Sequence, residues 1–260
     1  KSRKFQKSKT KLTTNTARFF NAYLVGWMFC VTIALGALFF VMVHHLVRSH
    51  WVVVVRRIAE VTAASFPLLA VMGLPVVISM LTSDHNPFHH WTHPHEGDAL
   101  VEAKDVYLNV PMFLIRYVVY FGVWSLLGTK LYRLSLQQDA HPDERIPAKQ
   151  RWWSALGVPL FAVTAAFAAF DFVMSVDPHW FSTIFGVYFF AGSYWTFVAF
   201  LAFTLAWLRR TGNLDEVVSA NHYLDLGRWM LGFTVFWAYI AFSQYMLIWY
   251  GNLKEETIWF

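Results

Sequence analysis

The sequence predicts an all-α, polytopic transmembrane helix bundle, and three observations favour this fold class. Hydrophobic residues make up 57% of the 260 residues and charged residues only 14%, whereas soluble domains are usually about 25% charged. Six stretches reach the length of about 20 apolar residues that a spanning helix needs. Aromatic residues, at 19%, suit a chain with many side chains at the membrane interface.

The six predicted spans cover residues 19–47, 61–82, 108–131, 152–176, 181–208 and 227–250. They divide the chain into four parts. These parts are a basic extramembrane segment (1–18), three spans with a His-rich loop at 83–107 (19–131), a polar connection (132–151), and three spans with the start of a further connection (152–260). The polar connection contains two prolines and is the predicted hinge. Pro67, Gly73 and Pro75 are expected to break the second span.

Charge predicts the orientation of the bundle. With the connections numbered in chain order, the first, third and fifth carry eleven Lys and Arg residues, and the second and fourth carry Lys104 alone. The positive-inside rule places the first, third and fifth in the cytoplasm and the other two in the periplasm. The first 18 residues, with seven basic groups, then lie outside, a conflict that a further helix before Lys1 would resolve.

Several cofactor and partner classes are excluded or disfavoured. Cys30 is the only cysteine, so the chain forms no internal disulfide, no Cys-ligated iron–sulfur cluster and no C-x-x-C-H haem site. Adjacent His44 and His45 point in two directions, which argues against a haem b bundle. The basic charge lies in short loops and in the first segment, and it does not indicate nucleic-acid binding.

The second connection is rich in side chains that bind metals. It holds His85, His89, His90, His93 and His95 with Asp84, Glu96 and Asp98. Residue type alone allows a metal site. Pro87 and Pro94, however, are expected to break any helical i, i+4 ligand geometry. We therefore expect a solvated loop, or one docked on a partner, and no metal.

Ionisable residues inside spans are costly and are functional candidates. Arg116 lies roughly 12 Å along the third span, and Tyr120 follows at i+4 on the same side. Arg116 either snorkels or pairs with a carboxylate. Asp171 lies late in the fourth span, where it either pairs with a cation or takes part in a proton path. Glu60 opens the second span and is expected at the membrane interface.

Two further groups of polar residues are candidates for proton transfer. Asp177 and Pro178 are a good N-cap and first residue for the fifth helix, and His179 can exchange protons with water. The sixth span carries a polar stripe that conducts water or bonds helices together. This stripe comprises Tyr239, Ser243, Gln244 and Tyr245.

Three stretches carry a resemblance to a known family. They are YLNVP at 107–111 leading to Arg116, MSVDPHWFST at 174–183, and FW at 236–237 with FSQYMLIWY at 242–250 and the residues from Asn252 to Thr257. Together they resemble the F subunit of bacterial alternative complex III, which is similar to the NrfD and polysulfide-reductase membrane subunits. The family positions that match are Arg116, Asp171, Asp177 and His179.

The resemblance implies a subunit of about ten helices in the bacterial inner membrane, with further helices before Lys1 and after Phe260. It implies haem c and iron–sulfur clusters on partner subunits, an NrfD-like sister subunit, quinol nearby, and no redox cofactor on this chain. The F subunit is assigned a proton-conducting or scaffold role in quinol:electron-acceptor oxidoreductase complexes.

The leading functional hypothesis is a membrane subunit that supports quinol oxidation and passes protons. Its proton-path candidates are Asp171, Asp177, His179, Glu60, Tyr239 and Gln244, with about 9 Å of helix between Asp171 and Asp177. In an alternative, the chain itself binds quinone, with Arg116, Tyr120 and Trp124 at the ring and His179 or Asp177 as proton acceptor. A secondary transporter and a structural anchor are the remaining alternatives.

Overall fold

The computed structural model describes residues 2–83, 85–94, 97–212, 214, 217–252 and 257, with the backbone alone for residues 2–15. In this part of the chain every regular element is a helix. In chain order they are α1 (Ser2–Leu46), the 3-10 helix η1 (Trp51–Val54), α2 (Arg56–Ala63), α3 (Phe66–Thr82), α4 (His89–Thr92), α5 (Ala99–Glu102), α6 (Val110–Ala140), α7 (Arg145–Phe172), the 3-10 helix η2 (Met174–Val176), α8 (Phe185–Arg210) and α9 (Ala220–Gly251).

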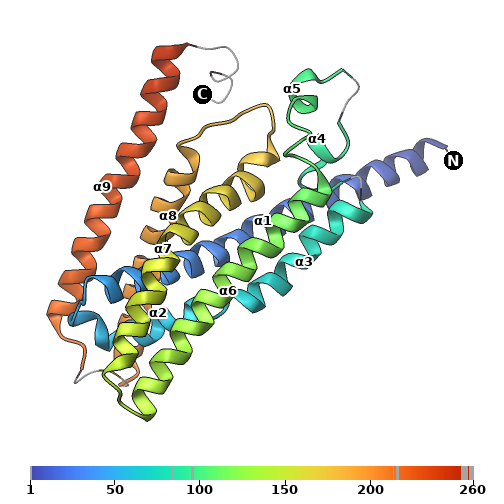
Figure 1. The fold of residues 1–260 in the computed structure, drawn as a ribbon. Helices are drawn as coiled ribbons and strands as arrows, with labels where there is room; N and C mark the ends of the chain where they lie inside the picture. Colours follow the sequence, from blue (N-terminus) through green and yellow to red (C-terminus); the bar gives the residue numbers. More distant parts are fainter. Residues whose placement is uncertain are drawn as a thin grey trace.

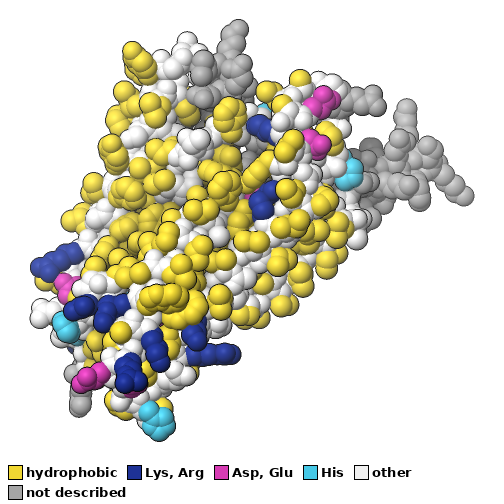
Figure 2. Space-filling view, in the orientation of Figure 1, with side chains coloured by type: hydrophobic (Ala, Val, Ile, Leu, Met, Phe, Trp, Pro, Cys, Tyr) yellow, Lys and Arg dark blue, Asp and Glu magenta, His cyan; other side chains and the backbone are white. Residues whose placement is uncertain are grey.

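Six helical stretches are long and apolar enough to cross a membrane, which confirms the predicted all-α, multi-pass fold. They are Thr16–Leu46, Arg56–Thr82, Val110–Ala140, Arg145–Val176, Phe185–Arg210 and Ala220–Gly251. Apolar side chains cover the flanks of the bundle in Figure 2, as expected for surfaces that face lipid.

Helix α1 is central to the bundle and packs against α2, α3, α7 and α8 (Figure 1). Val31, Ala34 and Leu38 on α1 are fully buried. A Cβ added at Gly36 would lie 2.4 Å from the Cβ of Phe197 on α8, so the two backbones approach more closely than any side chain would allow. Helix α9 packs mainly on α8 and leaves Leu231 and Val235 exposed.

The connections gather at two opposite ends of the bundle (Figure 1). At one end, which we call the basic end, Arg57 near the start of α2 bonds Asp139 near the end of α6. Figure 2 shows dark blue Lys and Arg side chains gathered there. The second and fourth connections meet at the other end, the loop end, where Lys104 donates a hydrogen bond to the carbonyl of Pro178. The assignment of these ends to cytoplasm and periplasm stays a prediction.

The third connection is much shorter than the polar stretch 132–151 suggests. Helix α6 continues to Ala140 and α7 begins at Arg145. Leu134 and Ser135 on α6 and Ile146 and Gln150 on α7 are buried. Because these side chains keep facing the bundle, both helices extend beyond their apolar cores, and the predicted hinge is reduced to residues 141–144.

The second span is broken once, between Ala63 and Phe66. Pro67 lies in the first turn of α3, where a missing N–H costs nothing. The expected breaks at Gly73 and Pro75 are wrong, because both lie inside the continuous α3. A Cβ at Gly73 would lie 2.3 Å from the Tyr117 hydroxyl, so this glycine allows a close helix contact.

The predicted start of the fifth helix at Asp177 and Pro178 is also wrong. Asp177 follows η2, and α8 begins eight residues later, at Phe185. The Asp177 carboxylate accepts a hydrogen bond from the backbone N–H of His179 at 3.2 Å, a local turn rather than a helix cap. Trp180 is buried and packs edge-on against Phe185, so tertiary contacts hold this segment as a folded loop.

Candidate functional site

A buried ionic cluster lies between α6 and α7, near the loop end. Arg116 is the seventh residue of α6, and Tyr120 follows one turn later on the same face. Asp171 is the second-last residue of α7. The two helices pack against each other, and this contact brings together residues that lie 55 positions apart in the sequence.

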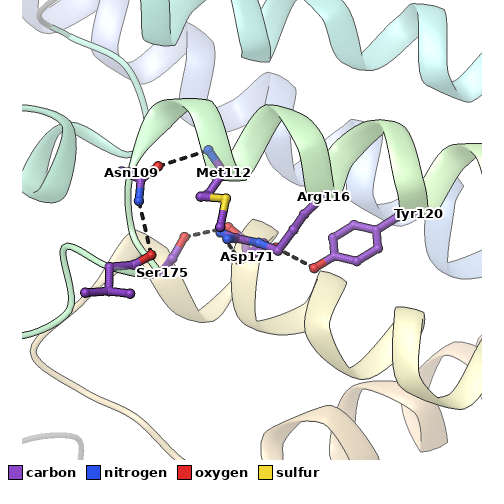
Figure 3. Close-up of polar contacts among 7 residues, drawn as sticks. Asn109, Met112, Arg116, Tyr120, Asp171 and Ser175 are labelled. Carbon is purple, nitrogen blue, oxygen red and sulfur yellow. Dashed lines mark hydrogen bonds and ion pairs between the residues drawn. The ribbon is translucent and has the colours of Figure 1, made fainter.

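Asp171 accepts three hydrogen bonds through its carboxylate (Figure 3). Arg116 donates from Nε to Oδ2 at 2.7 Å and from Nη2 to Oδ1 at 3.0 Å. The Tyr120 hydroxyl donates to Oδ2 at 2.6 Å. The carboxylate is fully buried and the Arg116 side chain is 17% exposed. The bidentate pair compensates a charge that would otherwise be very costly in an apolar bundle.

Neighbouring residues fix the positions of this pair. Asn109 caps α6, because its side-chain oxygen accepts a hydrogen bond from Met112 N at 2.9 Å. Ser175 in η2 donates its hydroxyl hydrogen to the backbone carbonyl of Asp171. The Arg116 guanidinium lies 3.9 Å from the centre of the Tyr107 ring, a favourable cation–π contact. Burial raises the pKa of Tyr107, and the Asp171 carboxylate raises it further, so the phenol stays protonated at neutral pH.

Tyr120 and Trp124 do not present their rings to an open space. The two rings stack at 5.9 Å, and both side chains are buried. The Trp124 indole donates a hydrogen bond to Thr164 Oγ1 at 2.9 Å. Tyr120 thus contributes its hydroxyl to the ionic cluster, and Trp124 contributes packing between α6 and α7.

A pocket of about 260 Å³ lies beside the cluster at the loop end. Its lining is mostly aromatic and apolar, with one cation at the rim: Lys104, Tyr107, Leu108, Phe170, Met174, Ser175, Pro178, Trp180 and Phe181. Tyr107 and Ser175 belong both to this lining and to the surroundings of Asp171. The pocket therefore adjoins the ionic cluster through these two residues.

Two polar contacts join the second and fourth connections above this pocket. Lys104 Nζ donates to the Pro178 carbonyl at 2.6 Å and lies 4.7 Å from the Phe181 ring centre. Partial burial lowers the pKa of Lys104. His179 Nε2 lies 2.8 Å from the Asp98 carboxylate, and this hydrogen bond lowers the pKa of Asp98.

The remaining proton-path candidates are spread over the bundle. Asp177 and His179 are exposed, and the expected continuous helix between Asp171 and Asp177 is wrong because α7 ends at Phe172. Gln244 is buried, whereas Tyr239 is 63% exposed. The structure therefore does not bring the α9 stripe together as one polar track.

Glu60 is buried at the basic end, and its expected position at the membrane interface stays a prediction. The residue is 1% exposed and pairs with Arg56 Nε at 3.0 Å and Arg57 Nη1 at 3.2 Å. Its two arginines lie in the same helix, at i−4 and i−3. A separate polar contact nearby joins His45 Nδ1 to Ser154 Oγ at 3.2 Å.

Three residues of the site are not predicted from the sequence to belong to it. Tyr107 and Ser175 lie inside the motif stretches, and Lys104 is the one basic residue of an otherwise acidic and His-rich connection. Its position as the single basic residue of this connection could have marked Lys104 as a candidate site residue. Asp84, His95, Glu96 and most of the stretch after Asn252 lie outside the described residues. Among the residues that are described, no three His, Cys, Asp or Glu side chains gather as a metal site.

The fold and this site define a multi-pass helical membrane protein with a buried ionic cluster near one end of the bundle. Neither a scan against protein-family models nor a search of curated proteins found a match to the chain.

Proposed function

We propose that this chain is a membrane subunit of a quinol:electron-acceptor oxidoreductase complex in the bacterial inner membrane, where it supports quinol oxidation and conducts protons. The observation that carries the proposal is the buried Asp171 carboxylate, held by Arg116 and Tyr120 next to the loop end. Ionisable groups inside membrane-spanning helices cost free energy and are typically retained for function. A protonatable oxygen in contact with a tyrosine hydroxyl suits proton transfer.

The residues of the resemblance to NrfD-like subunits support this proposal by their positions. Arg116 from the stretch 107–116 binds Asp171, 55 positions away in the sequence, and Tyr107 from the same stretch lies against the Arg116 guanidinium. Ser175 from the stretch 174–183 donates to the backbone carbonyl of Asp171 one turn before it. Under the proposal, haem c and iron–sulfur subunits and an NrfD-like sister subunit are the partners. Electron transfer takes place on them, and this chain supplies the proton route.

The geometry sets a condition on that route. Both Arg116 Nε and Tyr120 donate to Oδ2, and Arg116 Nη2 donates to Oδ1. Asp171 would accept a proton on Oδ1, the carboxylate oxygen with the fewer donors, while Oδ2 keeps its hydrogen bonds from Arg116 and Tyr120. From there the pocket, Tyr107 and the exposed pair of Asp177 and His179 lead toward water at the loop end. Glu60, at the basic end of the bundle, would belong to a separate entry point for protons.

Quinone binding by the chain itself is a second candidate, favoured by the pocket beside the cluster. Its lining supplies aromatic rings from Tyr107, Trp180 and Phe181. These three residues would contact the quinone ring. Tyr120 and Trp124, which the sequence analysis expected in that role, are engaged in packing instead. A Phe181→Ala change would then raise the quinol KM of the assembled complex and leave proton release per quinol unchanged.

The experiment compares Asp171→Asn and Tyr120→Phe in the assembled complex, with Asp225→Asn as control. Asp225 pairs with Arg228 at the exposed start of α9, so its change removes a carboxylate pair far from the cluster. Quinol oxidation, proton release and co-purification of the haem and iron–sulfur subunits are measured together. We expect both cluster variants to assemble, with Asp171→Asn slowing turnover by about 100-fold and Tyr120→Phe by about tenfold, within the range of general acid–base effects.

Other outcomes point to the alternatives. Normal turnover and normal proton release in a fully assembled Asp171→Asn complex would eliminate the proton-conducting role. Loss of assembly in Asp171→Asn, with normal turnover of Tyr120→Phe, would indicate a structural anchor.

A further inference from the structure

The hairpin of α6 and α7 at the basic end carries three cations that no described carboxylate neutralises. Lys130, Arg133 and Lys149 are exposed, and none of them forms an ion pair with another described residue. Residues 110–138 of α6 and 145–170 of α7 contain no Asp or Glu. Figure 2 shows dark blue Lys and Arg side chains gathered at this end of the bundle. The hairpin therefore presents a positively charged surface.

Helical spacing and one aromatic contact bring the three cations together. Lys130 and Arg133 share a face of α6 at i, i+3, and Lys149 shares a face of α7 with Trp153 at i, i+4. The Lys130 ammonium lies 5.7 Å from the centre of the Trp153 ring, so the two faces adjoin. Because α6 and α7 run antiparallel (Figure 1), Arg133 and Lys149 both lie about one turn nearer the hairpin tip. We call these four residues and Trp152 the hairpin site.

The hairpin site lies at the level where the apolar part of both helices ends. The apolar stretch of α6 ends at residue 131, and that of α7 begins at residue 152. Beyond this level α6 continues to Ala140, roughly 14 Å further along its axis. Trp152 is 60% exposed, and its ring packs edge-on against Trp153 at 5.2 Å. Exposed tryptophans beside cations are typical of the headgroup layer of a membrane, so this layer surrounds the site.

Exposed apolar side chains continue the hairpin site toward the middle of the membrane. Leu126 lies one turn before Lys130 on α6, and Leu156 lies one turn after Trp152 on α7, so each leucine shares a face with its partner. The two leucines are 55% and 42% exposed. The surface is therefore cationic at the headgroup level and apolar below it, which matches the two parts of a lipid molecule rather than a free anion.

An anionic phospholipid has the chemistry that this surface lacks. Its phosphate oxygens accept charge-assisted hydrogen bonds from ammonium and guanidinium groups. Basic pockets between transmembrane helices bind such headgroups. A zwitterionic headgroup brings a cation of its own next to the three on the protein, so it gains less from the same contact.

We propose that the hairpin site binds the headgroup of an anionic phospholipid, with the acyl chains against Leu126 and Leu156. Lys130, Arg133 and Lys149 bind the phosphate, and Trp153 positions Lys130. The site lies at the opposite end of α6 and α7 from the Asp171 cluster. It requires only that the chain lies in a membrane and does not depend on the proposed proton route.

The test measures lipid binding to the full chain in non-ionic detergent micelles by native mass spectrometry. Phosphatidylglycerol and phosphatidylcholine are titrated separately, and inorganic phosphate is added as a competitor. We expect the first phosphatidylglycerol to bind about tenfold more tightly than phosphatidylcholine and to resist displacement by an equal concentration of inorganic phosphate. Lys130→Gln, Arg133→Gln and Lys149→Gln should each weaken phosphatidylglycerol binding about fivefold, and the triple variant about 100-fold, as expected for cations near an anionic headgroup.

Arg228→Gln is the matched control. It removes the same charge from α9, which packs mainly on α8, so phosphatidylglycerol binding should not change. Lys130→Arg keeps the charge and should keep the affinity, which separates loss of charge from unfolding of the hairpin. The proposal is overturned if Arg228→Gln weakens binding as much as Lys130→Gln, or if phosphatidylcholine binds as tightly as phosphatidylglycerol. Displacement of the lipid by an equal concentration of inorganic phosphate would also overturn it.

Discussion

Two buried carboxylates, one near each end of the bundle, are neutralised by arginine in different ways. Glu60 at the basic end pairs with Arg56 and Arg57 from its own helix. Asp171 near the loop end pairs with Arg116 from a neighbouring helix and also accepts from Tyr120. Both carboxylates are buried, but the side chains of Arg56 and Arg57 are 25% and 36% exposed, against 17% for Arg116.

The two carboxylates differ in where the cations that compensate their charge come from. Glu60 has two cations, both partly exposed, so no single partner is essential. Asp171 has one cation, and that cation arrives only when α6 and α7 pack correctly. The ionic cluster near the loop end therefore depends on tertiary structure, whereas the pair at the basic end is built into one helix.

The largest effect is expected for Arg116→Ala. The change leaves the Asp171 carboxylate buried without its cation, and breaking a buried pair in this way costs about 3–5 kcal/mol. Reversible unfolding in detergent micelles would measure the loss, with Arg228→Ala at an exposed pair as control. A loss equal to that of the control would show that water already reaches Asp171.

Gly128→Ala should have the next largest effect, because it disturbs the packing of α6 against the segment that carries Glu60. A Cβ at Gly128 would lie 2.2 Å from the carbonyl oxygen of Ala63, at the end of α2. Such overpacking costs about 1–3 kcal/mol. Gly122→Ala on the same helix is the matched control, since nothing lies within 4 Å of the added Cβ, and its free energy of unfolding should not fall.

Arg56→Ala tests the local pair at the basic end directly. Arg57 still holds Glu60 after this change, so the expected loss is at most about 1 kcal/mol, as for partly exposed helix pairs. The same unfolding measurement applies. A loss as large as that of Arg116→Ala would contradict the distinction drawn between the two carboxylates.

The smallest effect is expected at the contact between Asp98 and His179. The hydrogen bond from His179 lowers the pKa of Asp98, so this contact stabilises the joined connections above the usual Asp range of about 3.9. Its contribution is lost as the pH falls through the lower pKa of folded Asp98. Carboxyl carbon resonances should show Asp98 titrating below its usual range in the original chain and within it in His179→Ala. Identical titration midpoints of Asp98 in the original chain and in His179→Ala would show that this contact does not form in solution.

Much of the fold could be predicted from apolar length alone. Six spans were expected and six are present, because a chain of this composition can bury its backbone polar groups in a membrane only as helices. Helix ends were less predictable. The extension of α6 to Ala140 and the late start of α8 at Phe185 depend on which polar residues face the bundle, and that is decided by packing.

The candidate site also combines features that are predictable from the sequence with features that depend on packing. The sequence predicts Arg116, Asp171 and Glu60 as ionisable groups within or beside apolar spans. It also predicts that Tyr120 lies one turn from Arg116, because helical periodicity fixes neighbours three or four residues apart. Tertiary packing brings Arg116 and Tyr120 to Asp171 and places Tyr107 over the guanidinium. It also brings Phe88 and Trp91 of the second connection against Phe113 of α6. These contacts join segments that no local pattern relates, since they follow from the packing of whole helices and loops against one another.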